Sequence, residues 1–115
     1  MACYYSVIQY IPNPIADERV NIGLIAYDES GHWGMEQLGN WQRAEAFTGL
    51  PGDNLRLHIN EFREFIESAG SAAAAVETAV HSWTHSVQLT PPRASLRSVD
   101  ELLKTTRDQV LVESY

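Results

Sequence analysis

The chain has 115 residues and a net charge of -7, with 15 acidic side chains against 8 basic ones. This length fits one domain spanning residues 1–115. The acidic balance argues against generic binding to nucleic acid or to an anionic membrane, because both require clustered cations. There is no apolar run of membrane-span length, no signal-peptide pattern, and only one cysteine, Cys3, which cannot form an internal disulfide. We therefore expect a cytoplasmic protein of one globular domain.

The first third of the chain predicts three antiparallel strands. Residues 3–11 are rich in tyrosine and β-branched side chains with two apolar faces, which predicts an interior strand covered on both sides. Residues 20–27 form a second apolar strand, interrupted by Asn21 and Gly23. A glycine inside a strand indicates either a β-bulge or a close approach by another backbone. After a turn, residues 32–38 predict a third strand.

Helices are predicted for the middle of the chain. A short helix at residues 41–47 precedes residues 53–69, where apolar side chains recur at spacings of three and four. Gly70 supplies the helix stop. An alanine-rich segment at residues 71–80 predicts a second, shorter helix packed on the first.

A strand and a helix complete the prediction. Residues 82–90 alternate apolar and polar side chains, which indicates a half-buried strand, and two prolines end it. Ser98 and Glu101 have the S-x-x-E spacing of a capping box at the start of a last helix. The order β-β-β-α-α-β-α predicts an α+β fold, with an antiparallel sheet of about four strands and helices packed on one face.

No motif in the sequence specifies catalysis or a metal. His81 and His85 have H-x-x-x-H spacing, but no glutamate between them supplies a general base and no cysteine pair completes a ligand set. Cys3 near the start of a core strand is typical of a small buried hydrophobe. Neither a G-x-S-x-G elbow nor a glycine-rich phosphate loop occurs. We expect no metal, no cofactor and no catalytic residue.

The one locally basic stretch is residues 91–99. Arg93 and Arg97 stand just before the predicted N-terminus of the last helix, where they could hold a phosphate or a carboxylate. The alternative is structural, with the two arginines tying the loop to acidic neighbours. The sequence leaves both open.

Two motifs carry a family resemblance. One is Y-S-V-I-Q-Y-I-P-N-P at residues 5–14 with E-R-V-N-I-G-L at residues 18–24, and the other is W-T-H-S-V-Q-L-T-P-P-R-A-S at residues 83–95. Together they resemble the signature of a bacterial family, domain of unknown function 3037. The resemblance implies a small bacterial cytoplasmic domain without an assigned activity. Such domains are sometimes encoded beside HipA-like kinases, which implies an accessory role with a protein partner.

The resemblance and the basic stretch together select the candidate site residues. The candidates for binding are Glu18, Asn21, Gln88, Arg93 and Arg97. The candidates for structural positions are Gly23, Trp83, Ser86 and Ser95. In a structural explanation, Asn21 and Gln88 are neighbours on the sheet that satisfy each other, and Glu18 pairs with Arg93. In a functional explanation, Glu18, Asn21, Gln88 and Arg93 converge on an open pocket.

Two functions follow from these alternatives. The first is an interaction domain without catalytic activity that docks onto a protein partner, with a HipA-like kinase as the implied partner. The second is a small enzyme or ligand-binding domain that acts on a phosphorylated or nucleotide-like anion. In that second hypothesis Arg93 and Arg97 grip the anion, and Glu18 acts as a base or metal ligand.

Overall fold

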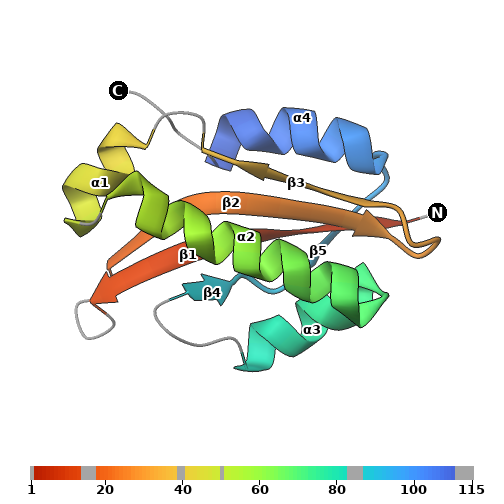
Figure 1. Cartoon of the computed structure of the whole chain (residues 1–115). Coiled ribbons are helices and arrows are strands. Elements are labelled where there is room, and N and C mark those ends of the chain that lie inside the picture. The colour runs from red at the N-terminus through yellow and green to blue at the C-terminus, as the bar shows by residue number, and fades with distance from the viewer. Residues whose placement is uncertain (1, 14–17, 39–40, 50, 83–86, 111–115) are drawn as a thin grey trace.

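A computed structural model describes residues 2–13, 18–38, 41–49, 51–82 and 87–110 (Figure 1). The elements in chain order are β1 (Cys3–Asn13), β2 (Glu18–Asp28), β3 (Trp33–Gln37), α1 (Gln42–Thr48), α2 (Gly52–Ala69), α3 (Ala72–Ser82), β4 (Val87–Leu89), β5 (Arg93–Ser95) and α4 (Val99–Val110). The predicted strand over residues 82–90 is therefore described only at β4. The strand β5 was not predicted.

The five strands form one antiparallel sheet in the order β3-β2-β1-β4, with β5 also paired to β1. The long strand β1 is central, because β2 lies along one side of it and the short strands β4 and β5 share the other side (Figure 1). The predicted α+β class and the antiparallel arrangement of the first three strands are confirmed.

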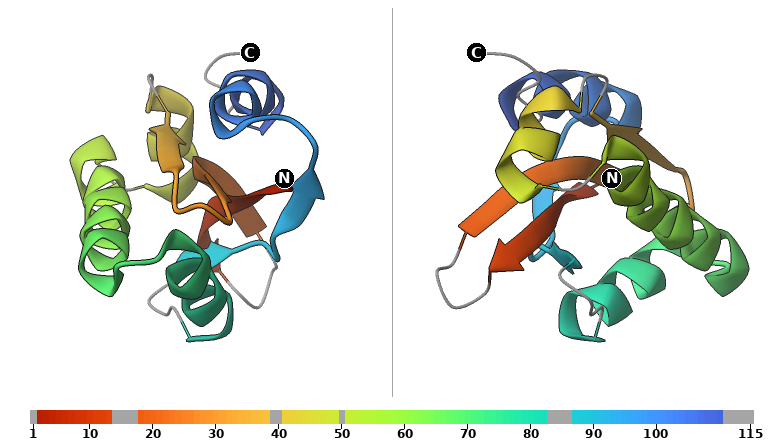
Figure 2. Two further views of the ribbon diagram at one scale, coloured as in Figure 1. Left: turned by 90° about the vertical axis from the view of Figure 1, so that its right-hand side faces the viewer. Right: turned by 60° about the vertical axis from the view of Figure 1, so that its left-hand side comes forward.

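Helices cover both faces of this sheet, which corrects the expectation of helices on one face. Gly23 and Ala26 are three residues apart on β2 and so face opposite sides. Gly23 lies against Ile59 of α2, whereas Ala26 packs with Val99 and Leu102 of α4. The helices α2 and α3 therefore lie on one side and α4 on the other (Figure 2). The two apolar faces of β1 explain why both sides need cover.

The larger core lies between the sheet and the helices α2 and α3. Ile8 and Ile25 from the sheet meet Ile59 and Phe62 of α2 and Val76 of α3, and all five side chains are fully buried. Burial of one such side chain contributes about 1.5–3 kcal/mol. The predicted apolar face of α2 is thus confirmed as the face that packs on the sheet.

A smaller cluster lies beneath α4. It contains Cys3, Ala26, Val99 and Leu102, and Cys3 is a free, buried thiol as predicted. Gly70 ends α2 with a φ of 77°, a left-handed conformation that explains the predicted glycine stop. Among the described residues, no helix has both the length and the apolarity needed to cross a membrane.

Candidate functional site

Three side-chain amides lie in a row across the sheet, one on each of three neighbouring strands. Gln9 of β1 is paired in register with Asn21 of β2 on one side and with Gln88 of β4 on the other. The Gln9 side-chain Nε2 donates a hydrogen bond to Asn21 Oδ1 at 2.9 Å. We name Asn21, Gln9 and Gln88 the amide row. Asn21 and Gln88 are thus not direct neighbours, because Gln9 stands between them.

A one-residue bulge in β2 produces this alignment. The two strands pair Ile8 with Gly23 and then Gln9 with Asn21, so that Ile22 is passed over. Without the bulge, Gln9 would lie opposite Ile22, and Asn21 would move to the other face of the sheet. The passed-over Ile22 is itself fully buried. The row therefore depends on a local irregularity that also buries an apolar side chain.

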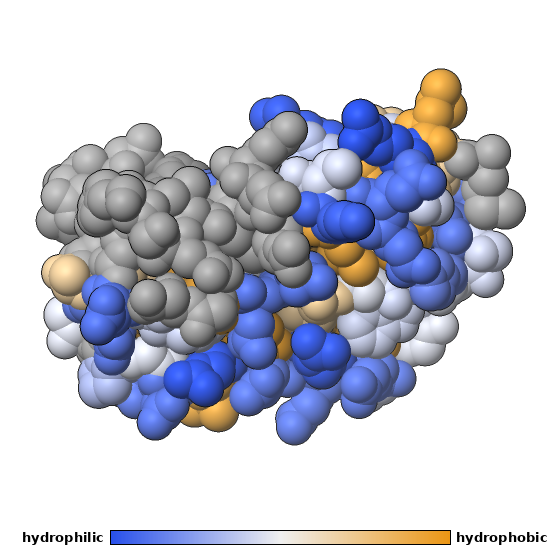
Figure 3. Space-filling view, turned by 90° about the horizontal axis from the view of Figure 1, so that it is seen from above, coloured by the Kyte–Doolittle hydropathy of each residue, from blue (hydrophilic) through white to orange (hydrophobic). Residues whose placement is uncertain are grey.

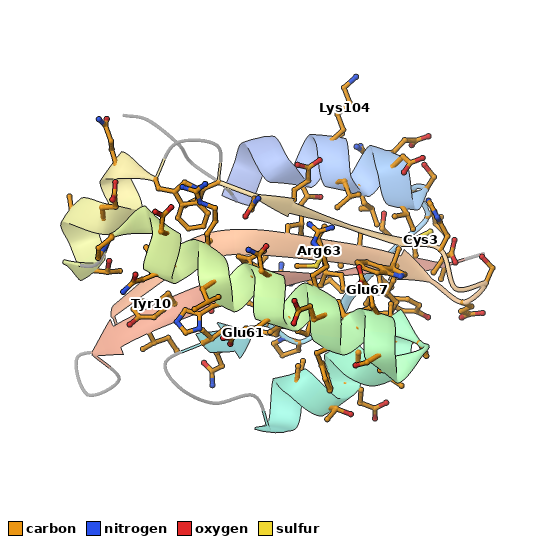
Figure 4. The ribbon with its side chains drawn as sticks, in the orientation of Figure 1. Cys3, Tyr10, Glu61, Arg63, Glu67 and Lys104 are labelled. Atoms are coloured by element: carbon orange, nitrogen blue, oxygen red, sulfur yellow. The ribbon has the colours of Figure 1, made fainter. Side chains whose placement is uncertain are left out.

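The position of the row along β1 can be followed in Figure 4. Tyr10, labelled there, marks the end of β1 that carries Gln9, and Cys3 marks the other end. The smaller cluster beneath α4 includes Cys3, so this helix packs over the Cys3 end of the strand. Gln9 and Asn21 are half-buried, whereas Gln88 is exposed.

The amide row is polar but contains no ionisable group. Each amide offers two N–H donors and one carbonyl acceptor, and none of them takes up or releases a proton near neutral pH. Val7 on β1 and Leu24 on β2 are paired beside the row, and both side chains are buried. Such a surface suits recognition of peptide-like polar groups and not acid–base chemistry.

Gly23, predicted as a point of close approach, lies directly against α2. A Cβ atom at this position would be 2.6 Å from Ile59 Cδ1, 3.2 Å from Ile8 Cδ1 and 3.3 Å from the Glu36 carbonyl oxygen. A larger residue would therefore displace α2 or strain the backbone of β3. The prediction of close approach is confirmed.

Hydrogen bonds that the sequence did not reveal join the two motifs. Ser6 is fully buried, and its Oγ donates to the Thr90 carbonyl oxygen. The Val7 N–H donates to Thr90 Oγ1 at 2.9 Å, and the Thr90 N–H donates to the Val7 carbonyl at 3.0 Å. These contacts fasten the end of β4 to β1. A lone serine and a lone glutamine within the apolar sequence of β1 were the available signals for Ser6 and Gln9.

Glu18 and Arg93 lie near opposite ends of β1. Glu18 is paired with Asn13, whereas Arg93 is paired with Tyr5, eight residues earlier on the strand. That interval corresponds to roughly 26 Å of extended chain, which is too far for an ion pair. The predicted pairing of Glu18 with Arg93 is therefore wrong, and the four signature residues do not meet in one pocket. The side chain of Glu18 lies outside the described part of the structure.

Arg93 and Arg97 are both exposed, on β5 and in the loop that follows it. Ser95 has a structural role here, since its Oγ accepts a hydrogen bond from the Arg97 backbone N–H at 3.1 Å. No ion pair to either arginine occurs among the described residues. The described side chains thus do not bear out the idea that these arginines tie the loop to acidic neighbours.

Acidic side chains already occupy the start of α4. Ser98 Oγ accepts a hydrogen bond from the Glu101 N–H at 3.3 Å, which confirms the predicted N-cap. Asp100 and Glu101 lie in the first turn, and Asp100 Oδ1 is 3.5 Å from His32 Nε2. Two carboxylates at the positive end of the helix dipole complement it and repel a further anion.

Other predicted positions lie beyond the described residues. Trp83, Ser86 and His85 fall in the segment outside them, and the side chain of His81 does as well. Within the ranges that the structure does describe, no three histidine, cysteine, aspartate or glutamate side chains are grouped to hold a metal ion.

Two described groups have clearly shifted pKa values, and both lie at the hairpin that joins β2 and β3. Burial raises the pKa of Tyr27, and the nearby Tyr4 and Glu77 raise it further. Hydrogen bonding, chiefly from the Ser30 side chain, lowers the pKa of Asp28. Each shift has a structural cause, and neither group adjoins the amide row.

The surface on the α4 side is mainly hydrophilic, with apolar side chains scattered over the described residues (Figure 3). In the described part of the chain, the large hydrophobic side chains that are exposed are Leu57 on α2 and Leu96 in the loop before α4. They lie on separate elements, so they do not form one apolar patch.

Comparison with known protein families identifies the family of the chain. The model of a family described as a protein of unknown function, DUF3037, matches residues 5–109. This span includes the strands of the amide row and both motifs of the sequence. No curated protein and no solved structure matches the chain significantly.

Proposed function

Because the chain belongs to the DUF3037 family, we propose that it is a small bacterial, cytoplasmic accessory domain that binds a protein partner without catalysing a reaction. The observation that supports this proposal is the amide row. The polar motif residues Asn21 and Gln88 flank Gln9 and offer hydrogen-bonding groups at one end of the sheet. A HipA-like kinase is the first partner to test, since the resemblance to the family implies it.

The chemistry of the row favours a protein surface as its ligand. A partner that lays backbone or amide groups against the row meets both donors and acceptors. The hydrogen bond from Gln9 to Asn21 fixes these two side chains before binding, which reduces the entropy lost on association. The exposed Gln88 is the member most accessible to a partner.

The test is a binding titration of the full chain with the purified HipA-like kinase. Gln88→Ala is expected to weaken the interaction about tenfold, the equivalent of one lost hydrogen bond. Asn60→Ala is the matched control, because Asn60 is an exposed amide on α2 and away from the row. No binding by the unmodified chain, or equal binding by both variants, would count against the proposal.

The second candidate function is a small enzyme or ligand-binding domain for a phosphorylated or nucleotide-like anion. It is favoured by the exposure of Arg93 and Arg97, which have no ion pair among the described residues. It is disfavoured by the carboxylates of Asp100 and Glu101 in the first turn of α4. Inorganic phosphate and a nucleoside diphosphate, titrated into the labelled chain, separate the two functions. Saturable shifts at the Arg93 and Arg97 amides would favour the anion site, and their absence would reject it.

A further inference from the structure

The outer edge of β3 has no strand beside it in the described structure. β3 is the last strand of the sheet and pairs only with β2 (Figure 1). All five of its residues are partly exposed. The strand W-G-M-E-Q contains no proline, lysine or arginine, the residues that commonly protect a sheet edge from pairing.

The hydrogen bonds at the two ends of the β2–β3 hairpin determine which backbone groups of β3 point away from the sheet. The Asp28 N–H donates to the His32 carbonyl, and the Leu38 N–H donates to the Ile22 carbonyl. In an antiparallel pair, every second residue of a strand directs its backbone N–H and C=O groups to the neighbouring strand. The even-numbered residues between His32 and Leu38 therefore also direct these groups to β2.

The odd-numbered residues of β3 therefore direct their N–H and C=O groups away from the sheet. These residues are Trp33, Met35 and Gln37. They form a continuous row of donors and acceptors for an added strand.

The side chain of Gln37 adds an independent observation at this edge. Its Oε1 atom is buried and has no hydrogen-bond partner among the described residues. A buried acceptor without a donor is rare in folded proteins and calls for an explanation. Gln37 and Trp33 lie on the same face of β3, and the indole N–H of Trp33 is a donor that cannot accept.

We propose that the β3 edges of two copies of this chain pair antiparallel across a two-fold axis at Met35. This interface is separate from the amide row, so it goes beyond the proposed function. In this register Met35 pairs with Met35, and Trp33 pairs with Gln37 of the second copy. All the outward backbone groups of the strand are then bonded, and two five-stranded sheets become one. Each Gln37 then lies opposite Trp33 of the second copy, and its Oε1, buried in the single chain, would accept from the indole N–H once the side chain turns toward the edge.

The position of Glu36 and the length of β3 favour this register over the two neighbouring ones. Glu36 is the only charged residue of β3, and it faces Gly34 of the second copy. A shift of two residues in one direction would set Glu36 directly opposite Glu36, which is unfavourable. A shift in the other direction would carry Gln37 past the strand and into the turn at Gly31. The pairing is self-complementary, as a two-fold interface requires.

The test is sedimentation equilibrium of the full chain over a range of concentrations. The unmodified chain is expected to be in monomer–dimer equilibrium. Met35→Pro is expected to abolish the dimer, because it removes an N–H that points away from β2 and leaves the bonds between β2 and β3 in place. A monomeric chain at every concentration, or unchanged association of Met35→Pro, would overturn the proposal.

A second pair of variants decides the question even if Met35→Pro fails to fold. In the proposed register the two Glu36 Cα atoms lie roughly 8 Å apart across the axis. Glu36→Gln removes their repulsion and is expected to tighten association about two- to fivefold. Glu64→Gln is the control, since it changes the net charge equally from an exposed site on α2. Equal association of the two variants would contradict the register.

Discussion

The two edges of the sheet differ in how they end. The edge opposite β3 consists of two strands of three residues, β4 and β5, with Pro91 and Pro92 between them. Ser6 and Thr90 fasten it to β1. The edge at β3 is one uninterrupted strand, and its outward backbone groups face no other strand in the described part of the chain. Prolines and very short strands disfavour edge pairing, so of the two edges that the structure describes β3 is the one better suited to pair with another chain.

The comparison also separates two kinds of residue. The described strand residues of both motifs belong to β1, β2, β4 and β5, where they form the amide row and the closed edge. Strand β3 lies outside both motifs. The motif residues thus form the closed edge and the amide row, whereas the open edge is formed by residues outside both motifs. Three substitutions test how each edge is supported.

The largest effect is expected at the support of β3. Gly23→Ala should reduce the free energy of unfolding by about 2–3 kcal/mol, because the new Cβ overlaps Ile59 and crowds the Glu36 backbone. Gly34→Ala is the matched comparison. Its Cβ would meet only the mobile end of Leu103, at 2.7 Å, so the expected loss is about 1 kcal/mol or less. Urea unfolding of both variants measures the difference, and equal losses would contradict the account.

An intermediate effect is expected at the closed edge. Ser6→Ala should cost about 1–2 kcal/mol, because it leaves the Thr90 carbonyl without its buried donor. Ser68→Ala is the control, since Ser68 is exposed and its Oγ bonds Phe65 within α2. The control should change stability by less than about 0.5 kcal/mol. Thermal unfolding of both variants checks this, and a Ser6→Ala curve that coincides with that of Ser68→Ala would refute the fastening role.

The smallest effect is expected at the turn between β2 and β3. The Asp28 carboxylate accepts hydrogen bonds from Ser30 and His32, and its pKa in the folded chain is lowered from the ordinary 3.8. A lowered folded pKa means that the carboxylate stabilises the turn above pH 3.8 and loses this effect as the pH falls through the folded pKa.

Amide spectra of Ser30 and His32, recorded as the pH is lowered from about 5 to about 2, measure this loss. At about pH 5 the Ser30 and His32 amide signals of Asp28→Asn should differ from those of the unmodified chain, because the turn is less stable. At about pH 2 the two sets of signals should coincide. Asp53→Asn, at an exposed position on α2, should leave the turn's titration unchanged. A difference between Asp28→Asn and the unmodified chain that persists at low pH would contradict this assignment.

Local patterns were sufficient for much of the fold. Leu55, Ile59, Phe62 and Ile66 recur at helical spacing, and all four are buried in α2. The tyrosine and β-branched side chains of β1 and the apolar run of β2 predicted strands, and Gly23 inside the second run indicated a bulge or a close approach. Each of these features depends on residues close together in the sequence.

The missed features depend on pairing between distant segments. The amide row requires the bulge at Ile22, which sets Asn21 opposite Gln9. Gly23 indicated a bulge or a close approach, but no local pattern places the extra residue at Ile22. Glu18 and Arg93 were expected to meet because both belong to the motifs, but their register positions along β1 separate them. The strand β5 exists only because Tyr5 and its neighbours provide a partner for three residues that follow two prolines.

Backbone hydrogen exchange along β3, resolved by residue, tests the difference between the two edges most directly. At low protein concentration the amides of Trp33, Met35 and Gln37 are expected to exchange fast, whereas those of Gly34 and Glu36 exchange slowly because they donate to β2. At high concentration the first three are expected to become slow as two β3 edges pair. Uniform exchange along the strand, or fast exchange of the odd-numbered amides at every concentration, would contradict the account.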